Sequence, residues 1–216
     1  MSHSQPKISL FYEVARVVIN WFFTTFYDFS TSGTRNVPLV ESSILATNHV
    51  SFYDPPVISL YAHRQLSYFA RDSLFKGFLG KCIRKLNAIP VARDSADIKS
   101  LKTIFKILNS KGAIVIFPEG TRSVDGKVAE PKPGTGMVVC KSKAIVVPVR
   151  IFGTFEVFSR HKKLPSLGGA IHVSYGQPIP AETIDPGKDH PERYLEVSRR
   201  ILAAINKLEA PKYTII

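Results

Sequence analysis

The 216-residue sequence contains only two cysteines, Cys82 and Cys140, which lie far apart in the chain. They form no metal-ligand spacing and no disulfide framework, so the sequence indicates neither a zinc site nor a disulfide-stapled fold. The simplest interpretation is reduced thiols in a reducing compartment such as the cytosol. We therefore expect no resident metal and no bound cofactor.

Acidic residues are also scarce, with 17 Asp plus Glu against 29 Lys plus Arg, for a formal net charge of +12. This balance favours anionic partners such as nucleic acid, phospholipid surfaces or phosphorylated substrates. The sequence lacks a helix-turn-helix, a zinc finger and an RNA-binding aromatic motif, so we do not expect nucleic acid as a partner. A basic, non-catalytic lipid-binding or nucleic-acid-binding protein stays open as an alternative.

The chain has no long uninterrupted apolar run. The most apolar stretch, residues 8–29, is broken by Glu13, Arg16 and Asn20, which makes it a poor membrane span, and it lacks the features of a secretory signal peptide. On a helical projection these three residues and Thr24 form one narrow polar stripe. We expect a helix that lies in the membrane interface, on the cytoplasmic face. Packing against the protein core, or a short hairpin dipping into one leaflet, are the alternatives.

The length and the 44% hydrophobic content fit one domain with a single appendage. Short apolar runs alternate with helical patterns, which is typical of an α/β layer structure. We predict an α/β single domain with a central, mostly parallel mixed sheet flanked by helices, comprising residues 36–216. Residues 1–35 would form the N-terminal amphipathic membrane-associating segment. The predicted strands are 43–46, 66–70, 88–91, 113–117, 145–152 and 170–175.

Helical spacing of apolar residues predicts a helix from Ile98 to Leu108, capped by Asp94 or Ser95. A last helix over 192–209 has an apolar face and closes the fold. Between them, residues 123–136 are rich in proline and glycine and are predicted to form an active-site loop or a surface excursion.

The most informative motif runs from Thr47 to Pro56 and places His49 five positions before Asp54. In a regular helix the two residues would not share a face, so a turn must bring them together. If His49 ends a strand and Asp54 precedes the proline that opens a helix, the carboxylate reaches the imidazole. Such a pair is typical of a general base with its orienting carboxylate. A helix cap beside a buried histidine is the structural alternative.

Ser51 is a poor candidate nucleophile, because it lacks the G-x-S-x-G setting, and we expect it to hydrogen-bond the turn or cap the helix. A substrate hydroxyl activated by His49 is the more economical attacking group.

A second segment, Phe117 to Ser123, follows an apolar strand. Gly120 permits a tight turn, backbone amides there can point at an anion, and Arg122 can hold a phosphate with paired hydrogen bonds. A structural turn held by a Glu119–Arg122 contact is the alternative. Arg93, after another short strand, is a candidate second phosphate contact.

These motifs, in this order, resemble the lysophosphatidic acid acyltransferase family, the 1-acyl-sn-glycerol-3-phosphate acyltransferases. Asn48-His49 through Asp54 is similar to the family's N-H-x-x-x-x-D block, and residues 88–93 are similar to its second block. Phe117-Pro118-Glu119-Gly120-Thr121-Arg122-Ser123 and residues 147–151 resemble the third and fourth. The similarity covers roughly residues 40–155.

The resemblance implies that His49 is the base on the acceptor hydroxyl and that Asp54 orients it. It also implies that Arg93 and the segment Glu119, Gly120, Thr121 and Arg122 bind the glycerol phosphate, while Val147 and Pro148 shape a substrate pocket. The implied reaction joins a lysophospholipid to an acyl group from acyl-CoA or acyl carrier protein, at a membrane surface.

The sequence departs from the family's usual blocks at two places, and both affect the prediction of the acceptor. Asn87 stands where the family usually has glycine, and residues 130–134 replace a more usual Pro-Phe-Lys-x-Gly run. Another lyso-lipid acceptor, such as lyso-ornithine lipid, therefore stays open. The basic tracts 81–85 and 160–163 are candidates for binding anionic headgroups, acyl carrier protein or coenzyme A, or are solvated charge.

Overall fold

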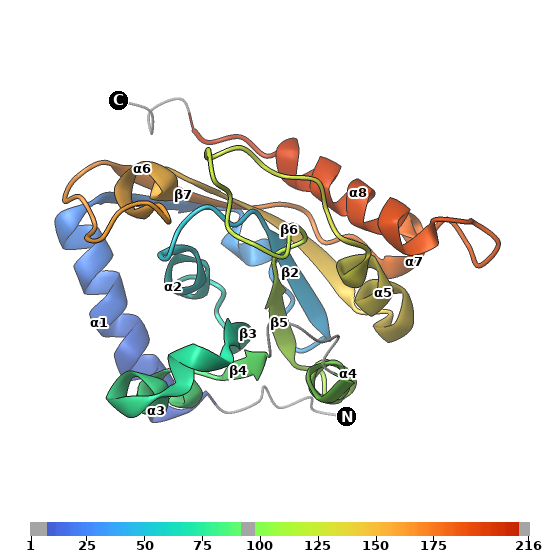
Figure 1. Ribbon diagram of the computed structural model, residues 1–216, viewed down its shortest axis with the longest axis horizontal. Helices are drawn as coiled ribbons and strands as arrows, with labels where there is room; N and C mark the ends of the chain where they lie inside the picture. The colour runs from blue at the N-terminus through green and yellow to red at the C-terminus, as the bar shows by residue number, and fades with distance from the viewer. Residues whose placement is uncertain (1–7, 92–97, 212–216) are drawn as a thin grey trace.

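The computed structural model describes residues 8–91 and 98–211 (Figure 1). A seven-stranded sheet in the order β1-β7-β6-β2-β5-β3-β4 runs through the molecule. All neighbouring strands are parallel except β6 and β7, which pair antiparallel. The prediction of an α/β fold with a mostly parallel mixed sheet is confirmed.

The strands are β1 (Asp28–Ser32), β2 (Ser43–Thr47), β3 (Leu66–Arg71), β4 (Ala88–Val91), β5 (Ala113–Ile116), β6 (Ile145–Phe152) and β7 (Ala170–Tyr175). The helices are α1 (Leu10–Phe26), α2 (Asp54–Ser59), α3 (Gly77–Lys85), α4 (Ile98–Asn109), α5 (Pro133–Ser142), α6 (Thr154–Phe158), α7 (Ala181–Ile184) and α8 (Arg193–Asn206). Two short 3-10 helices, η1 (Thr34–Asn36) and η2 (Asp72–Phe75), complete the described chain.

The six predicted strands are present with ends shifted by at most one residue, whereas β1 was not predicted. Its residues, DFSTS, lack a continuous apolar run. It pairs in parallel with β7, from Asp28 opposite Ala170 to Ser32 opposite Ser174. The apolar stretch therefore ends as a helix at Phe26, and the chain that follows belongs to the sheet.

The two faces of the sheet bury different side chains because successive residues of a strand point to opposite faces. Along β2, Leu45 packs in the core with α1 and α2, whereas Ile44 and Ala46 pack in the core with α4, α5 and α8. The predicted last helix is α8, slightly shorter than expected. The predicted 123–136 loop ends earlier, because Pro133 opens α5 with a proline at its first turn.

Helix α1 differs from the expectation in how it uses its polar stripe. Arg16 donates to the carbonyl oxygen of Leu60 at 3.1 Å and to Glu13, and Asn20 accepts from the hydroxyl of Tyr61 at 2.9 Å. The stripe thus contacts the protein, and a wide apolar arc is left on the surface. No helix in the described ranges is long and apolar enough to cross a bilayer.

Candidate functional site

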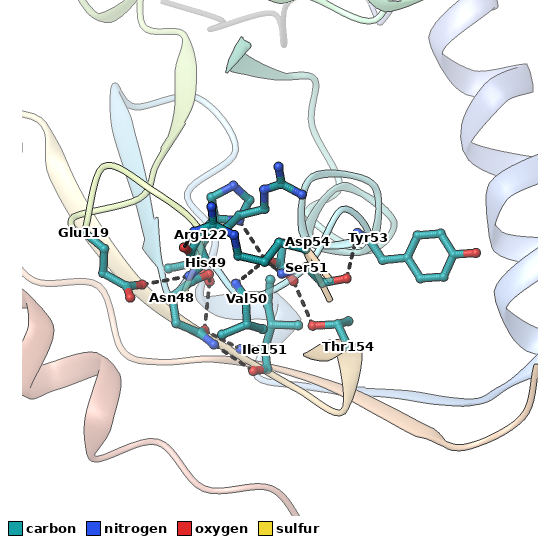
Figure 2. Close-up of polar contacts among 12 residues, drawn as sticks. Asn48, His49, Val50, Ser51, Tyr53, Asp54, Glu119, Arg122, Ile151 and Thr154 are labelled. Atoms are coloured by element: carbon teal, nitrogen blue, oxygen red, sulfur yellow. Dashed lines mark hydrogen bonds and ion pairs between the residues drawn. The ribbon is translucent and has the colours of Figure 1, made fainter. Parts of the chain in front are cut away.

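The candidate site lies where β2 ends and the chain turns into α2 (Figure 2). Nδ1 of His49 is 2.8 Å from Oδ2 of Asp54, so the contact predicted from the sequence is present. Asp54 is fully buried, while 18% of the His49 side chain is exposed. An ionised carboxylate only accepts hydrogen bonds, so Nδ1 carries the proton and Nε2 keeps a free lone pair.

The Asp54 carboxylate is held by three further donors. Its Oδ2 also accepts from the backbone amides of Val50 at 2.7 Å and Ser51 at 2.8 Å, and its Oδ1 accepts from the hydroxyl of Thr154 at 2.8 Å. The amides close the turn that the sequence required between His49 and Asp54. These hydrogen bonds hold the Asp54 carboxylate in one position, and the carboxylate in turn holds the His49 imidazole in one orientation.

Thr154 was not predicted. It is fully buried at the start of α6, just after β6. Gly153 before it has a φ of 79°, and a Cβ there would lie 1.8 Å from the carbonyl oxygen of Ala170. Only glycine fits that close approach and that left-handed conformation, so a Gly-Thr pair after an apolar strand was the available sequence signal.

Ser51 has the structural role expected for it. Its hydroxyl donates to the carbonyl oxygen of Phe158 at 2.8 Å and accepts from the amide of Tyr53 at 3.0 Å. These bonds join the turn to the end of α6. Asn48 joins it to β6, since its side-chain amide pairs with the backbone N–H and carbonyl of Ile151 at 2.8 and 2.9 Å.

Glu119 is buried next to the turn between His49 and Asp54, with 1% of its surface exposed. One oxygen accepts from the amide of His49 and the other from the amide of Ala129, both at 2.8 Å. Burial raises the pKa of this carboxyl, and the amide hydrogen bonds oppose that rise. The Glu119–Arg122 contact, which was the structural alternative for this segment, is absent among the described ion pairs. Glu119 instead ties the segment after β5 to the backbone of the histidine.

Arg122 extends on the same side of the turn as His49 (Figure 2). Its guanidinium carbon lies 3.6 Å from the centre of the Phe52 ring, and one terminal nitrogen is buried without a hydrogen-bond partner among the described residues. Burial lowers the pKa of Arg122, and the nearby charges of Arg160 and Arg71 lower it further. Arg160 belongs to the basic tract 160–163 that the sequence analysis named, whereas Arg71, the last residue of β3, was not predicted.

The remaining predicted residues lie in different surroundings. Gly120 has a φ of 70° in an exposed turn, as expected for this residue, and Thr121 beside it is exposed. Val147 and Pro148 are buried in the middle of β6, paired with β2. Their role in shaping a substrate pocket stays a prediction. Arg93 lies outside the described residues, as do the predicted caps at 94 and 95.

Two other features of the sequence can now be placed. Asn87 has a φ of 63°, a left-handed conformation that asparagine tolerates better than most residues, so it can replace glycine there without changing the backbone. Cys82 and Cys140 are both free thiols. Among the described residues no group of three or more His, Cys, Asp or Glu side chains is placed to hold a metal ion.

Comparison with known proteins identifies matches across most of the chain. The Acyltransferase family matches residues 28–152. The chain is 25% identical over 164 residues to the chloroplastic 1-acyl-sn-glycerol-3-phosphate acyltransferase LPAT1 of Arabidopsis thaliana, covering 74% of this chain and 46% of that protein. It is 26% identical over 153 residues to the 1-acyl-sn-glycerol-3-phosphate acyltransferase of Bacillus subtilis, covering 68% and 76%.

A solved structure has the same fold. The crystal structure of the 1-acyl-sn-glycerophosphate (LPA) acyltransferase PlsC from Thermotoga maritima superposes with a TM-score of 0.70 at 24% identity, over 93% of this chain and 80% of that one. The chain spans about half the length of the chloroplastic relatives from Arabidopsis thaliana and Brassica napus that it matches.

Proposed function

Because the chain belongs to the acyltransferase family, we propose that it moves a fatty acyl group from an acyl thioester to the 2-hydroxyl of lysophosphatidate. The product would be phosphatidate, for phospholipid biosynthesis. The observation that carries the proposal is the His49–Asp54 pair, which leaves Nε2 of His49 available. Beside it lies Arg122, one nitrogen of which has no hydrogen-bond partner among the described residues. The names of the matched relatives support the choice of acceptor.

In the proposed mechanism, Nε2 of His49 takes the proton of the acceptor hydroxyl as its oxygen attacks the thioester carbonyl carbon. The carbon–oxygen bond forms, the tetrahedral intermediate collapses, and the carbon–sulfur bond breaks. The leaving thiolate receives the proton from the imidazolium. Asp54 holds the imidazole in the required tautomer and stabilises its positive charge throughout.

Arg122 is proposed to bind the phosphate of the acceptor. Its guanidinium is fixed by Phe52 and repelled by Arg71 and Arg160, so an anion placed among the three would relieve that repulsion. Arg93 is the other proposed phosphate ligand. Holding the phosphate fixes the distance from the 2-hydroxyl to the base, which is the positioning that acyl transfer requires.

Glu119 is proposed to hold the backbone around this site in position. Both of its oxygens are occupied by backbone amides, so it orients the segment Gly120 to Arg122 relative to His49. Gly120 and Thr121 are the exposed residues of that segment and are the proposed neighbours of the acceptor.

The donor is proposed to be acyl-CoA or acyl carrier protein, and the reaction is proposed to occur at a membrane surface. The exposed apolar arc of α1 supports the membrane contact, because such an arc is typical of helices that lie in the interface. The two free thiols suit a reducing compartment and hence the cytoplasmic face.

The test is thioester-dependent conversion of lysophosphatidate to phosphatidate in detergent or vesicles, by wild type and His49→Ala. Loss of a positioned base typically costs about 10² to 10⁴ in rate, and we expect a fall in that range. His63→Asn is the matched control, since His63 is exposed and has a φ of 53° that asparagine tolerates. Full activity in His49→Ala would contradict the proposed base.

Lyso-ornithine lipid, assayed in parallel, tests the alternative acceptor that the changed 130–134 segment leaves open. Turnover of lyso-ornithine lipid in preference to lysophosphatidate would keep the chemistry and replace the substrate. Absence of turnover with both acceptors and with both donors would favour a binding protein.

A further inference from the structure

The outer surface of α1 is mainly apolar, whereas the outer face of a helix in water is typically polar or charged. Its apolar arc consists of five large side chains that are each more than half exposed: Leu10 (81%), Val14 (54%), Val17 (64%), Val18 (57%) and Trp21 (62%). Figure 1 shows α3 near one end of α1 and the loop between α6 and β7 near the other. Each of these two segments combines exposed apolar side chains with lysines and forms a further cluster.

The first cluster lies at the N-terminal end of α1 and is formed by η2 and α3. Phe78 is 82% exposed and Leu74 is 48% exposed. Lys81 and Lys85 follow Phe78 at helical spacings of three and seven, so all three side chains leave the same face of α3. The ammonium of Lys85 lies 5.1 Å from the centre of the Phe11 ring on α1, which places the cluster against the apolar arc.

The second cluster lies at the C-terminal end of α1, in the loop between α6 and β7. Leu164 is 78% exposed and Leu167 is 69% exposed, and Lys163 precedes them on the surface. The loop is attached to α1, since the amide of Gly168 donates to the carbonyl oxygen of Phe26 at 3.0 Å.

The chemistry of the two clusters is the same. Exposed apolar side chains lie beside Lys81, Lys85 and Lys163, and among the described residues none of these lysines forms an ion pair. Large apolar groups flanked by unpaired cations complement a bilayer surface, where the apolar groups enter the acyl boundary and the cations meet phosphates. A water-facing surface accommodates exposed lysines but rarely gathers several large apolar side chains beside them.

We propose that α1, α3 and the 160–169 loop form one platform that binds bilayers containing anionic phospholipids. The α1 arc inserts into the interface, and the clusters at its two ends bind headgroup phosphates through Lys81, Lys85 and Lys163. Contact at both ends fixes the direction of α1 on the membrane as well as its depth. This inference rests on the membrane association proposed above and adds its residues and its lipid preference.

The platform is connected to the candidate site at both ends. β3 is parallel to β5, which is parallel to β2, so η2 and α3 leave the same edge of the sheet as His49. At the other end, Ser51 of the turn donates to the carbonyl oxygen of Phe158, just before the second loop. Binding at both clusters therefore holds this edge in a fixed orientation to the lipid.

The first experiment measures partition of the full chain onto vesicles, with no acyl donor or acceptor present. Lys81→Gln/Lys163→Gln removes one cation from each cluster. A lysine near an anionic surface contributes a factor of about five in binding, so partition onto vesicles of two parts phosphatidylcholine to one part phosphatidylglycerol should fall about 25-fold. Partition onto pure phosphatidylcholine should change less than twofold.

Lys141→Gln/Lys207→Gln is the matched control. It removes the same charge from two exposed lysines, one in α5 and one at the end of α8, which pack on the opposite face of the sheet. Its partition should stay within about twofold of wild type, because screening limits the reach of a surface charge to about 10 Å. An equal loss in the control and test variants would overturn the inference, as the effect would then be net charge alone.

The second experiment uses the single tryptophan, Trp21. In wild type its emission reports insertion of α1. Moving the tryptophan, with Trp21→Phe combined with Phe78→Trp or with Leu167→Trp, reports each cluster in turn. We expect a shift of the emission to shorter wavelength at all three positions when anionic vesicles are added. An unshifted emission at position 78 or 167 in vesicle-bound protein would overturn the two-ended platform.

The two experiments separate this inference from the proposed reaction. With saturating acyl donor, Lys81→Gln/Lys163→Gln should retain the wild-type kcat in detergent micelles and lose activity only on vesicles, if the reaction is as proposed. Wild-type partition by this variant would overturn the platform whatever its activity. If the wild type binds anionic vesicles but does not carry out acyl transfer, the proposed acceptor or donor is rejected and the platform is kept.

Discussion

The buried hydroxyl of Thr154 provides a sharp test of how the site is held. Thr154→Val keeps the shape of the side chain but removes the donor to Oδ1 of Asp54, which is at 2.8 Å in a fully buried position. A hydrogen bond to a charged group contributes about 1.5 to 3 kcal/mol. If this energy holds the carboxylate in its working position, kcat should fall between about tenfold and about a hundredfold.

The assay is acyl transfer to the acceptor proposed above, with kcat and KM determined separately. KM should change little, because Thr154 has no part in the proposed phosphate site. Thr154→Ser is the control, since it keeps the hydroxyl and loses only a methyl group, and it should recover most of kcat even if it lowers the unfolding free energy. The reasoning is refuted if Thr154→Val keeps kcat within twofold of wild type, or if serine is as harmful as valine.

Glu119→Gln should lower the unfolding free energy by about 1 to 3 kcal/mol in urea titrations, because the buried amide offers one acceptor oxygen to two backbone N–H groups. Glu130→Gln, at an exposed position, is the control. Gly136→Ala should also destabilise, by about 1 to 3 kcal/mol, since a Cβ there lies 1.9 Å from the carbonyl oxygen of Tyr194, whereas Gly134→Ala, with nothing within 4 Å, should not. Burial lowers the pKa of His172, so the unfolded chain takes up this proton at a higher pH than the folded protein does. The unfolding free energy should therefore fall as the pH drops below about 6.5, by at most about 1.4 kcal/mol per unit, and His172→Gln should lose this component. Equal slopes in the two proteins would contradict this account of His172.

Local patterns in the sequence were sufficient for most of the sheet. The strand β2 is buried along its whole length, β6 is mostly buried, and both are mainly apolar. Such runs identify strands without reference to the rest of the chain. The strand β1 was missed because its five residues, DFSTS, are mainly polar. They pair with β7, and hydroxyls of Ser30 and Ser32 bind the buried ring of His172 at 2.9 and 3.0 Å. That partner is about 140 residues away, so no local signal marks the strand.

The helix α1 also shows the difference between what a local pattern predicts and what the fold decides. The sequence showed a wide apolar face and a narrow polar stripe, and it predicted a helix for the membrane interface. It did not show which side contacts the protein. In the structure the stripe is satisfied by Leu60 and Tyr61, so part of the apolar surface stays outside. Helical projection gives the angles between side chains, but the fold decides which angle faces inward.

The sequence by itself determined the chemistry of the candidate site: a histidine with its aspartate after one strand, and a glycine and an arginine after another. Spacing and turn-forming residues carry that information because His49 and Asp54 are only five positions apart in the chain. Tertiary structure alone decided what surrounds them. Thr154 reaches Asp54 across 100 residues, and Glu119 reaches the amide of His49 across 70. These contacts exist because parallel strands bring their carboxyl ends to one edge of the sheet, a meeting that no local stretch of sequence records.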